Sequence, residues 1–191
     1  MKFSLMPLCL LLINSVAWAD WQSVPEESEI NFISIKKGSV AETHRFDAFS
    51  LSFSETGKAK LTIDLSSVNT GIDIRNERMK EVLFEVAQYP SATFTAEVDD
   101  VKMSELMIGD RIQRNVEGQF TMHGKTVPMT MTLKAVKLAG GDVLVTTVAP
   151  AIIDAKNFDL VNGILKLQEL AGLPSIASAI PVTFEILMRK Q

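Results

Sequence analysis

Residues 116–133 have the sequence VEGQFTMHGKTVPMTMTL, and this stretch decides the predicted fold. Apolar and polar side chains alternate over residues 116–122, and the alternation resumes over residues 127–133. A period of two is typical of a β-strand with one buried face. The connection at residues 123–126 contains Gly124, which tolerates the positive φ of a tight hairpin turn. The stretch therefore predicts two antiparallel strands joined by a short turn.

The same alternation recurs along most of the chain. It is present at residues 29–34, 49–54, 60–65, 93–98, 143–147 and 180–189. With the hairpin above, these segments predict about eight half-buried strands. Short connections that contain glycine, at residues 54–57 and 139–142, favour antiparallel pairing, because parallel neighbours need a long crossover.

Two stretches have a helical period instead. Residues 76–88 place apolar side chains on one face, with Asn76 as the expected N-cap, and residues 159–171 do the same before Gly172. We therefore expect an all-β fold of eight antiparallel strands with one or two short α-helices. The strands could close into a barrel, which can hold a ligand, or form a two-sheet sandwich filled by its own side chains.

Residues 1–19 have the features of a secretory signal peptide. Lys2 provides a positive start, and a nearly continuous apolar run follows over residues 3–13. Ala17 and Ala19 match the small-residue cleavage pattern, so we expect cleavage after Ala19. The remaining residues, 20–191, are expected to form one domain.

Composition restricts the chemistry that the chain can perform. The net charge of −4 argues against nucleic acid as a partner, because such domains carry a basic face. The single cysteine, Cys9, lies in the predicted leader, and the chain has only two histidines, His44 and His123. They lack the spacing of a zinc site, and no phosphate-binding or nucleophile motif is present. We therefore expect no catalytic residue, metal site or cofactor.

Five stretches, in order along the chain, resemble the YceI-like lipid/polyisoprenoid-binding family. They are Trp21 with residues 28–32 (SEINF), residues 66–76 (SSVNTGIDIRN), residues 83–94 (LF before YPSATF), residues 116–124 (VEGQFTMHG) and residues 155–158 (AKNF). The chain departs from the family pattern at His44, where a glycine is usual, and at Asn76, where an aspartate is common. The resemblance implies an exported, lipocalin-like eight-stranded β-barrel of a bacterial periplasm. It also implies that the lumen takes a long isoprenoid or similar lipid tail for transport or storage, without catalysis.

Nine apolar side chains are the candidates for contact with such a tail. They lie on the apolar faces of the predicted strands: Phe32, Phe49, Phe53, Phe94, Phe120, Met122, Met129, Met131 and Phe184. Phenylalanine supplies contact area, and methionine adapts to a flexible chain. The same residues would also fill a dry core, so the pattern alone leaves both interpretations open.

Three polar residues are candidates for the lipid headgroup. Arg75 and Arg78 could bind a phosphate, or they could form ion pairs with Asp73, Glu77 or Glu81. His44 could meet the headgroup at the barrel mouth or be an ordinary strand-end residue.

Two other functions stay open at this point. One is a lipid-modifying enzyme that uses His44 or His123 at the barrel mouth, and the other is a packed β-domain that binds proteins. A homodimer and a transient membrane contact are also compatible with the sequence.

Overall fold

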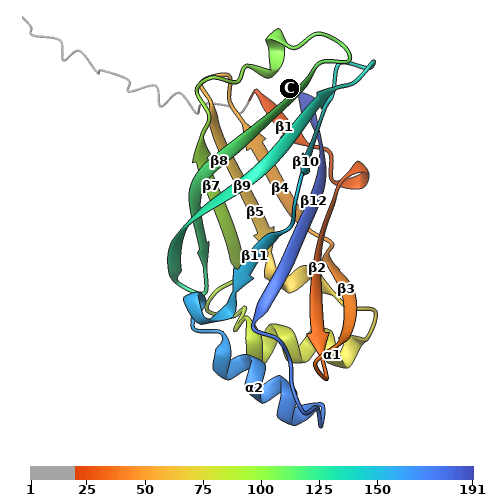
Figure 1. The fold of residues 1–191 in the computed structure, drawn as a ribbon, viewed down its shortest axis with the longest axis vertical. Helices are drawn as coiled ribbons and strands as arrows, with labels where there is room; N and C mark the ends of the chain where they lie inside the picture. Colours follow the sequence, from red (N-terminus) through yellow and green to blue (C-terminus); the bar gives the residue numbers. More distant parts are fainter. Residues whose placement is uncertain (1–19) are drawn as a thin grey trace, which may run out of the picture.

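The computed structural model describes residues 20–191, and the predicted signal peptide lies outside this part (Figure 1). The strands are β1 (Trp21–Ser23), β2 (Glu29–Lys36), β3 (Val40–Phe46), β4 (Phe49–Phe53), β5 (Lys58–Asp64), β6 (Val68–Asn69), β7 (Ser91–Glu97), β8 (Arg111–Met122), β9 (Lys125–Lys137), β10 (Val143–Thr147), β11 (Ala151–Asp154) and β12 (Ala179–Lys190). Short 3-10 turns between strands are η1 (Pro25–Glu27), η2 (Leu65–Ser67) and η4 (Met103–Glu105).

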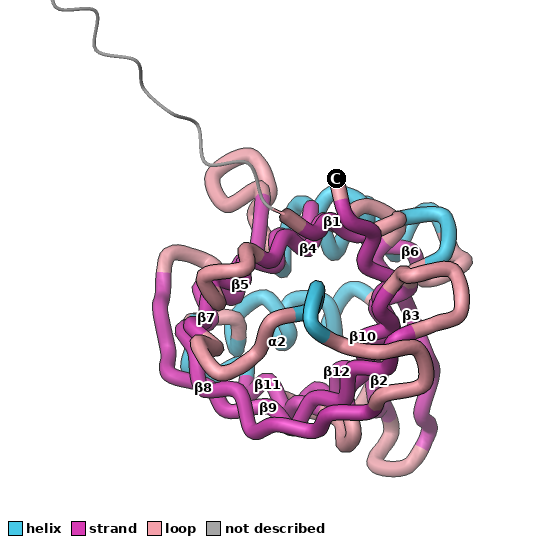
Figure 2. Tube along the Cα trace, turned by 90° about the horizontal axis from the view of Figure 1, so that it is seen from above, coloured by secondary structure: helices cyan, strands magenta, loops and turns pink. Residues whose placement is uncertain are grey.

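Eight of these strands form a closed ring, which Figure 2 shows from above. Their order around the ring is β1–β4–β5–β7–β8–β9–β10–β12, and each neighbouring pair is antiparallel. The short strand β1 closes the ring, because Trp21 is paired with Phe53 of β4 on one side and with Lys190 of β12 on the other. The expected eight-stranded antiparallel barrel is confirmed, and the sandwich alternative is wrong.

The remaining strands lengthen one part of the wall. The C-terminal half of β12 pairs with β10 and β1, whereas its N-terminal half pairs with β11 and β2. β3 continues the sheet beyond β2, and β6 pairs with β3. None of β1, β3, β6 and β11 was among the predicted strands. Most are too short to show a period, and β3 carries the polar His44 at an inward position.

The central hairpin has the predicted alternation. Val116, Phe120 and Met122 of β8 are buried, whereas Glu117 and Gln119 are exposed. Pairing continues to Met122 and Lys125, so His123 and Gly124 alone make the turn, with φ values of 50° and 72°. Positive φ at both positions is the geometry that matches the twist of the flanking strands.

Two helical segments lie below the barrel in Figure 1. The first is α1 (Asp73–Arg78), which continues directly into a π-helical turn, η3 (Met79–Leu83). The second is α2 (Val161–Leu170), which follows the 3-10 turn η5 (Ala155–Phe158) and ends before Gly172 at φ 60°. Within residues 20–191, neither helix has the length and apolar character needed to cross a membrane.

The prediction for the first helix was wrong at both ends. Asn76 does not cap it, because its Oδ1 accepts hydrogen bonds from the backbone N and the Oγ1 of Thr70 and so braces the preceding corner. Helical backbone ends before residue 88, because Glu85 adopts a φ of 48°, in the left-handed region.

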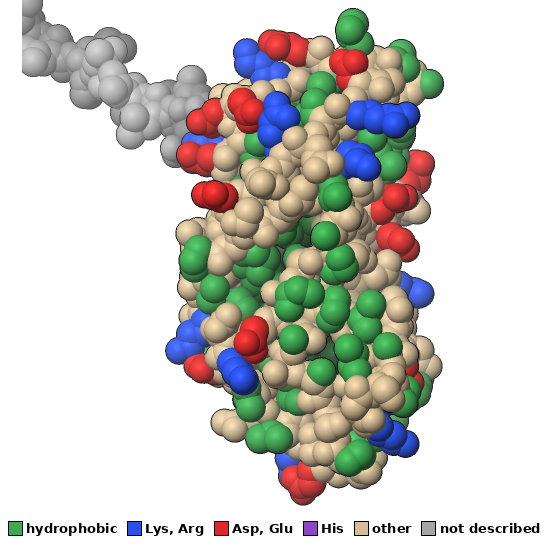
Figure 3. All heavy atoms as spheres, in the orientation of Figure 1, with side chains coloured by type: hydrophobic (Ala, Val, Ile, Leu, Met, Phe, Trp, Pro, Cys, Tyr) green, Lys and Arg blue, Asp and Glu red, His purple; other side chains and the backbone are tan. Residues whose placement is uncertain are grey.

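On the face shown in Figure 3, hydrophobic side chains gather in the lower half, over β11 and β12. Ile152 of β11 is 57% exposed and is among the large hydrophobic residues that the surface leaves uncovered. The strand that carries Ile152, β11, was not among the predicted strands, so the sequence analysis did not predict this exposure.

Gly118 fixes how closely β7 and β8 approach. A Cβ at this position would lie 2.4 Å from Cζ of Phe94 and 2.4 Å from the carbonyl oxygen of Thr95. The second of these atoms belongs to the backbone, so a side chain here must displace the neighbouring strand. The missing side chain therefore leaves room for the Phe94 ring inside the barrel.

We predict that Gly118→Ala lowers the free energy of unfolding by about 1–3 kcal/mol, the usual effect of overpacking a core. Urea denaturation measures it. Gly140→Ala is the matched control, because nothing lies within 4 Å of its added Cβ, and we expect a change within about 0.5 kcal/mol. Equal losses in the two variants would contradict the packing argument.

Candidate functional site

The barrel interior contains a cavity of about 370 Å³ lined almost entirely by apolar side chains. A second, smaller cavity of about 90 Å³ lies further along the interior. Four side chains line both cavities and separate them: Leu61, Phe94, Met131 and Phe184. We call these four residues the partition.

The structure places most of the nine tail candidates on this lining. Phe32, Phe120, Met122 and Met129 line the large cavity, Phe53 lines the small one, and Phe94, Met131 and Phe184 line both. Phe49 packs against the core but lines neither cavity. The contact of these residues with a lipid stays a prediction.

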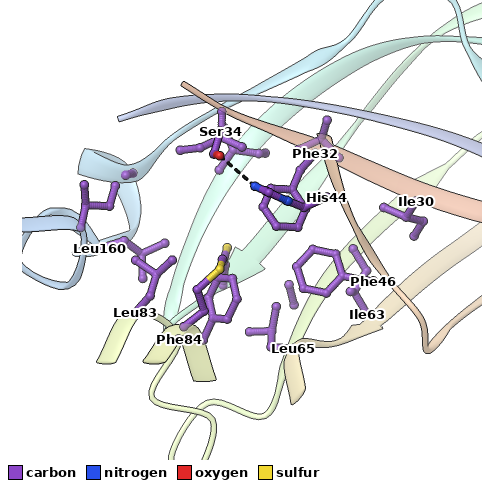
Figure 4. A pocket seen from close by; sticks show the side chains of 18 of the residues that line it. Ile30, Phe32, Ser34, His44, Phe46, Ile63, Leu65, Leu83, Phe84 and Leu160 are labelled. Carbon is purple, nitrogen blue, oxygen red and sulfur yellow. Dashed lines mark hydrogen bonds between the residues drawn. The ribbon is translucent and has the colours of Figure 1, made fainter. Parts of the chain in front are cut away.

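The helical segments contribute lining that the sequence did not assign to a site. These residues are Met79, Leu83 and Phe84 from α1 and the turn after it, and Leu160, Ile164 and Leu167 from α2 and its start. Their spacing predicted apolar helix faces, but a period cannot show what such a face covers. Here the faces close the lower end of the barrel around the cavity (Figures 1 and 4).

The cavity reaches the surface between the β2–β3 hairpin and the helices. Its lining there includes the partly exposed side chains of Lys36, Arg75 and Arg78 and the exposed Ala171. The chain after α2 runs alongside the end of β2, where Lys37 N donates to the Ser175 carbonyl. This end is the mouth of the cavity.

Polarity changes in steps along the inner face of the β2–β3 hairpin. From the interior toward the tip, the inward residues of β2 are Ile30, Phe32, Ser34 and Lys36. Their registered partners on β3 include Phe46 opposite Ile30, His44 opposite Phe32 and Glu42 opposite Ser34. The wall thus passes from aromatic and aliphatic side chains, through neutral polar ones, to charged ones at the mouth.

His44 lies in the middle of this series and is 5% exposed (Figure 4). Its Nε2 is 2.9 Å from Ser34 Oγ, and its ring centroid is 5.2 Å from that of Phe32. Burial lowers the pKa of His44, and the positive charges of Arg75 and Lys36 lower it further, against the opposing effect of Glu42. The imidazole is therefore held in its neutral form.

The charged groups at the mouth form a small network. Glu42 accepts from Lys36 Nζ at 2.7 Å and from Arg75 Nη1 at 2.6 Å. The hydrogen bond from Lys36 has the largest effect, and with the bond from Arg75 it holds the pKa of Glu42 below its ordinary value. Partial burial acts in the opposite direction and raises this pKa. Arg75 also donates from Nη2 to the Thr70 carbonyl at 2.7 Å. The ion pair foreseen for Arg75 thus exists, but with a carboxylate far away in the sequence.

The third headgroup candidate, Arg78, lies on the helical side of the mouth. Its Nη1 donates to the carbonyl oxygen of Leu170, at the end of α2, over 3.2 Å. The structure therefore brings His44, Arg75 and Arg78 to the lining of one cavity.

His123 lies apart from this site, in the β8–β9 turn. Its Nε2 is 2.9 Å from Glu85 Oε2, and its ring packs on Tyr89 with centroids 4.3 Å apart. Within residues 20–191, no group of three or more His, Cys, Asp or Glu side chains could hold a metal ion. What the arrangement offers is an apolar chamber with polar groups at one end.

Solved structures with this architecture exist. A polyisoprenoid-binding domain from Saccharophagus degradans, implicated in plant cell wall breakdown, superposes with a TM-score of 0.87 at 37% identity, over 91% of this chain and 100% of that domain. BcnA of Burkholderia cenocepacia (TM-score 0.66, 20% identity, 88% and 99% coverage) and the YceI protein of Campylobacter jejuni (0.55, 17%, 78% and 85%) share the fold. No curated protein matches the sequence.

The match to a family is more extensive than any of the five stretches that first indicated it. The family model of the YceI-like domain matches residues 21–188, which is nearly the whole of the described chain. The chain therefore belongs to the YceI-like family.

Proposed function

We propose that this protein binds the tail of a long isoprenoid, or of a similar amphiphilic lipid, inside the barrel. The observation that carries the proposal is the apolar cavity of about 370 Å³ with a polar mouth. The similar domain from Saccharophagus degradans is a polyisoprenoid-binding domain, which supports the same ligand class here. The protein acts by holding the lipid, for transport or storage, and not by catalysis.

The size of the cavity agrees with a lipid tail. A cavity of about 150 Å³ holds one benzene molecule, so each carbon needs roughly 25 Å³. At that packing the large cavity takes about 15 carbons, or three isoprene units. Burial at about 0.8 kcal/mol per methylene would give about 12 kcal/mol. This is comparable with the association cost of about 4–15 kcal/mol, so most of the cavity must be filled for binding.

We further propose that the protein works in the periplasm. The predicted signal peptide at residues 1–19 and the absence of cysteine from the rest of the sequence support export without disulfides. A water-filled compartment between two membranes is a place where an apolar tail needs a protein to cover it.

The two alternative functions have less support. A packed protein-binding domain would have little reason to keep an apolar cavity of this volume. An enzyme that used His123 is disfavoured, because that ring is bonded to Glu85 and does not line the cavity.

Ile63 of β5 lines the large cavity and is 6% exposed, so a larger side chain there extends into the space that a tail would fill. We predict that Ile63→Trp weakens binding of farnesol, a C15 prenol, at least about tenfold, because the indole displaces several carbons of the tail. Competition against a fluorescent prenyl probe measures it.

The neighbouring variant Thr62→Trp is the control, because the strand alternation directs position 62 to the outside. It should bind farnesol as the unmodified protein does. If Ile63→Trp folds, as judged by its melting curve, and still binds with unchanged affinity, the tail does not occupy this cavity.

The partition predicts a break in the dependence of affinity on tail length. Tails longer than about 15 carbons must move Phe94 or its partners to reach the small cavity. We predict that geranylgeraniol, a C20 prenol, gains less over farnesol than farnesol gains over the C10 geraniol. Phe94→Leu should restore most of the missing gain.

Phe120→Leu is the matched control for this length series. It makes the same substitution on the lining of the large cavity but does not touch the small one. A uniform gain per isoprene unit in the unmodified protein, or equal effects of the two variants, would show that the partition does not limit the tail.

A further inference from the structure

Most of the large hydrophobic side chains that the surface leaves exposed lie at one end of the barrel. The structure exposes nine such residues within residues 20–191. We call five of them the apolar rim: Val40, Ile72, Ile74, Leu165 and Leu170. Each is between 39% and 59% exposed. Exposed hydrophobic residues that are scattered singly need no explanation, but a group of them around an opening is typical of an interaction surface.

The apolar rim comes from three segments that the fold brings to the mouth of the cavity. Val40 begins β3 at the tip of the β2–β3 hairpin, Ile72 and Ile74 lie at the start of α1, and Leu165 and Leu170 lie in α2. Ile74, Leu165 and Leu170 each adjoin in the sequence a residue that lines the cavity. Both helices and the hairpin tip lie at the lower end in Figure 1. The rim therefore borders the opening of the cavity.

The charge around the rim differs from that of the whole chain. Residues 36–42, 70–81 and 161–170 carry six Lys and Arg against five Asp and Glu, whereas the whole chain has 19 against 23. Within residues 20–191, Lys37 and Arg78 form no ion pair, and Arg78 donates to the carbonyl oxygen of Leu170. The excess of negative charge lies on the rest of the molecule, so an anionic bilayer repels the rim less than the remaining surface.

A body that covers the rim also covers the mouth of the cavity. A second copy of the chain in this position would close the route by which a tail enters. A lipid bilayer would not, because it is the phase in which a molecule with a long apolar tail resides. The rim side chains would enter the boundary of the acyl chains, while Lys37 and Arg78 would keep their charges among the headgroups.

We propose that the apolar rim docks this protein on the surface of a lipid bilayer, with the mouth of the cavity toward the membrane. The contact is reversible, because five side chains that are already half covered offer little apolar area. The lipid then passes between bilayer and cavity without crossing water. This inference rests on the proposed function, because it states how the lipid that the cavity holds is exchanged.

The rate at which the protein takes a lipid from vesicles tests the docking. The vesicles contain phosphatidylethanolamine, phosphatidylglycerol and a self-quenched fluorescent prenyl probe, and the delipidated protein is present in excess. If transfer occurs by contact, its rate constant should rise with protein concentration. A rate constant that is independent of protein concentration would contradict the docking, because release of the probe into water would then limit the transfer.

The double variant Ile74→Ser/Leu165→Ser removes two rim side chains that do not line the cavity. We expect its rate of transfer from vesicles to fall at least about tenfold, because less apolar surface reaches the bilayer. Its affinity for farnesol in solution should stay within about twofold of that of the unmodified protein.

Val148→Ser/Ile152→Ser is the matched control. These two residues are 45% and 57% exposed, but they lie on β11 or just before it and do not line the cavity. This variant should take up the probe as fast as the unmodified protein does. If melting curves show that the double rim variant does not fold, Ile74→Ser and Leu165→Ser singly serve for the same comparison.

Two further results would overturn the docking. One is an equal rate of transfer in the two double variants. The other is a loss of oligomeric mass in the rim variant, measured by light scattering, which would identify the rim as an interface between copies of the chain. An unchanged transfer rate with farnesol binding retained would reject the docking alone, whereas no uptake and no farnesol binding by the unmodified protein would reject the proposed function as well.

Discussion

Closure of the barrel by β1 is the constraint on which the rest of the structure depends. This strand has three residues, yet it pairs with both β4 and β12 and so covers the edges at which the ring would otherwise be open. Trp21 anchors it: the indole is 1% exposed, its Nε1 donates to Glu55 Oε1 at 2.8 Å, and Lys137 Nζ lies 4.4 Å from the ring centroid. Without this closure the strands would have no lumen between them.

The closed ring of eight strands encloses an interior in which a ligand can be held. Its inward side chains are apolar over most of the length, and the helical segments cover only the lower end. The partition divides the interior, while the β2–β3 hairpin supplies a graded change from aromatic to charged residues at the mouth. A molecule with a long apolar part and a small polar part matches this distribution of polarity along its whole length.

The sequence predicted the long strands of the barrel wall better than it predicted the residues around the mouth of the cavity. Alternation over residues 116–133 identified the longest hairpin and its turn, because half-buried strands must repeat every two residues. It missed β3, where the inward positions before Phe46 carry His44 and Glu42 and so interrupt the apolar alternation. It also proposed Phe49 as a tail contact, although Phe49 lines neither cavity. The pairing of Arg75 with Glu42 was also missed, since the two are 33 residues apart and meet only through the fold.

Native mass spectrometry of the protein, purified without detergent or added lipid, tests the central claim most directly. The account predicts folded ions heavier than the chain by the mass of one lipid, which collisional activation releases as a neutral prenyl-type molecule. Folded ions of the bare chain alone, in repeated preparations from an envelope fraction that contains isoprenoid lipids, would contradict it.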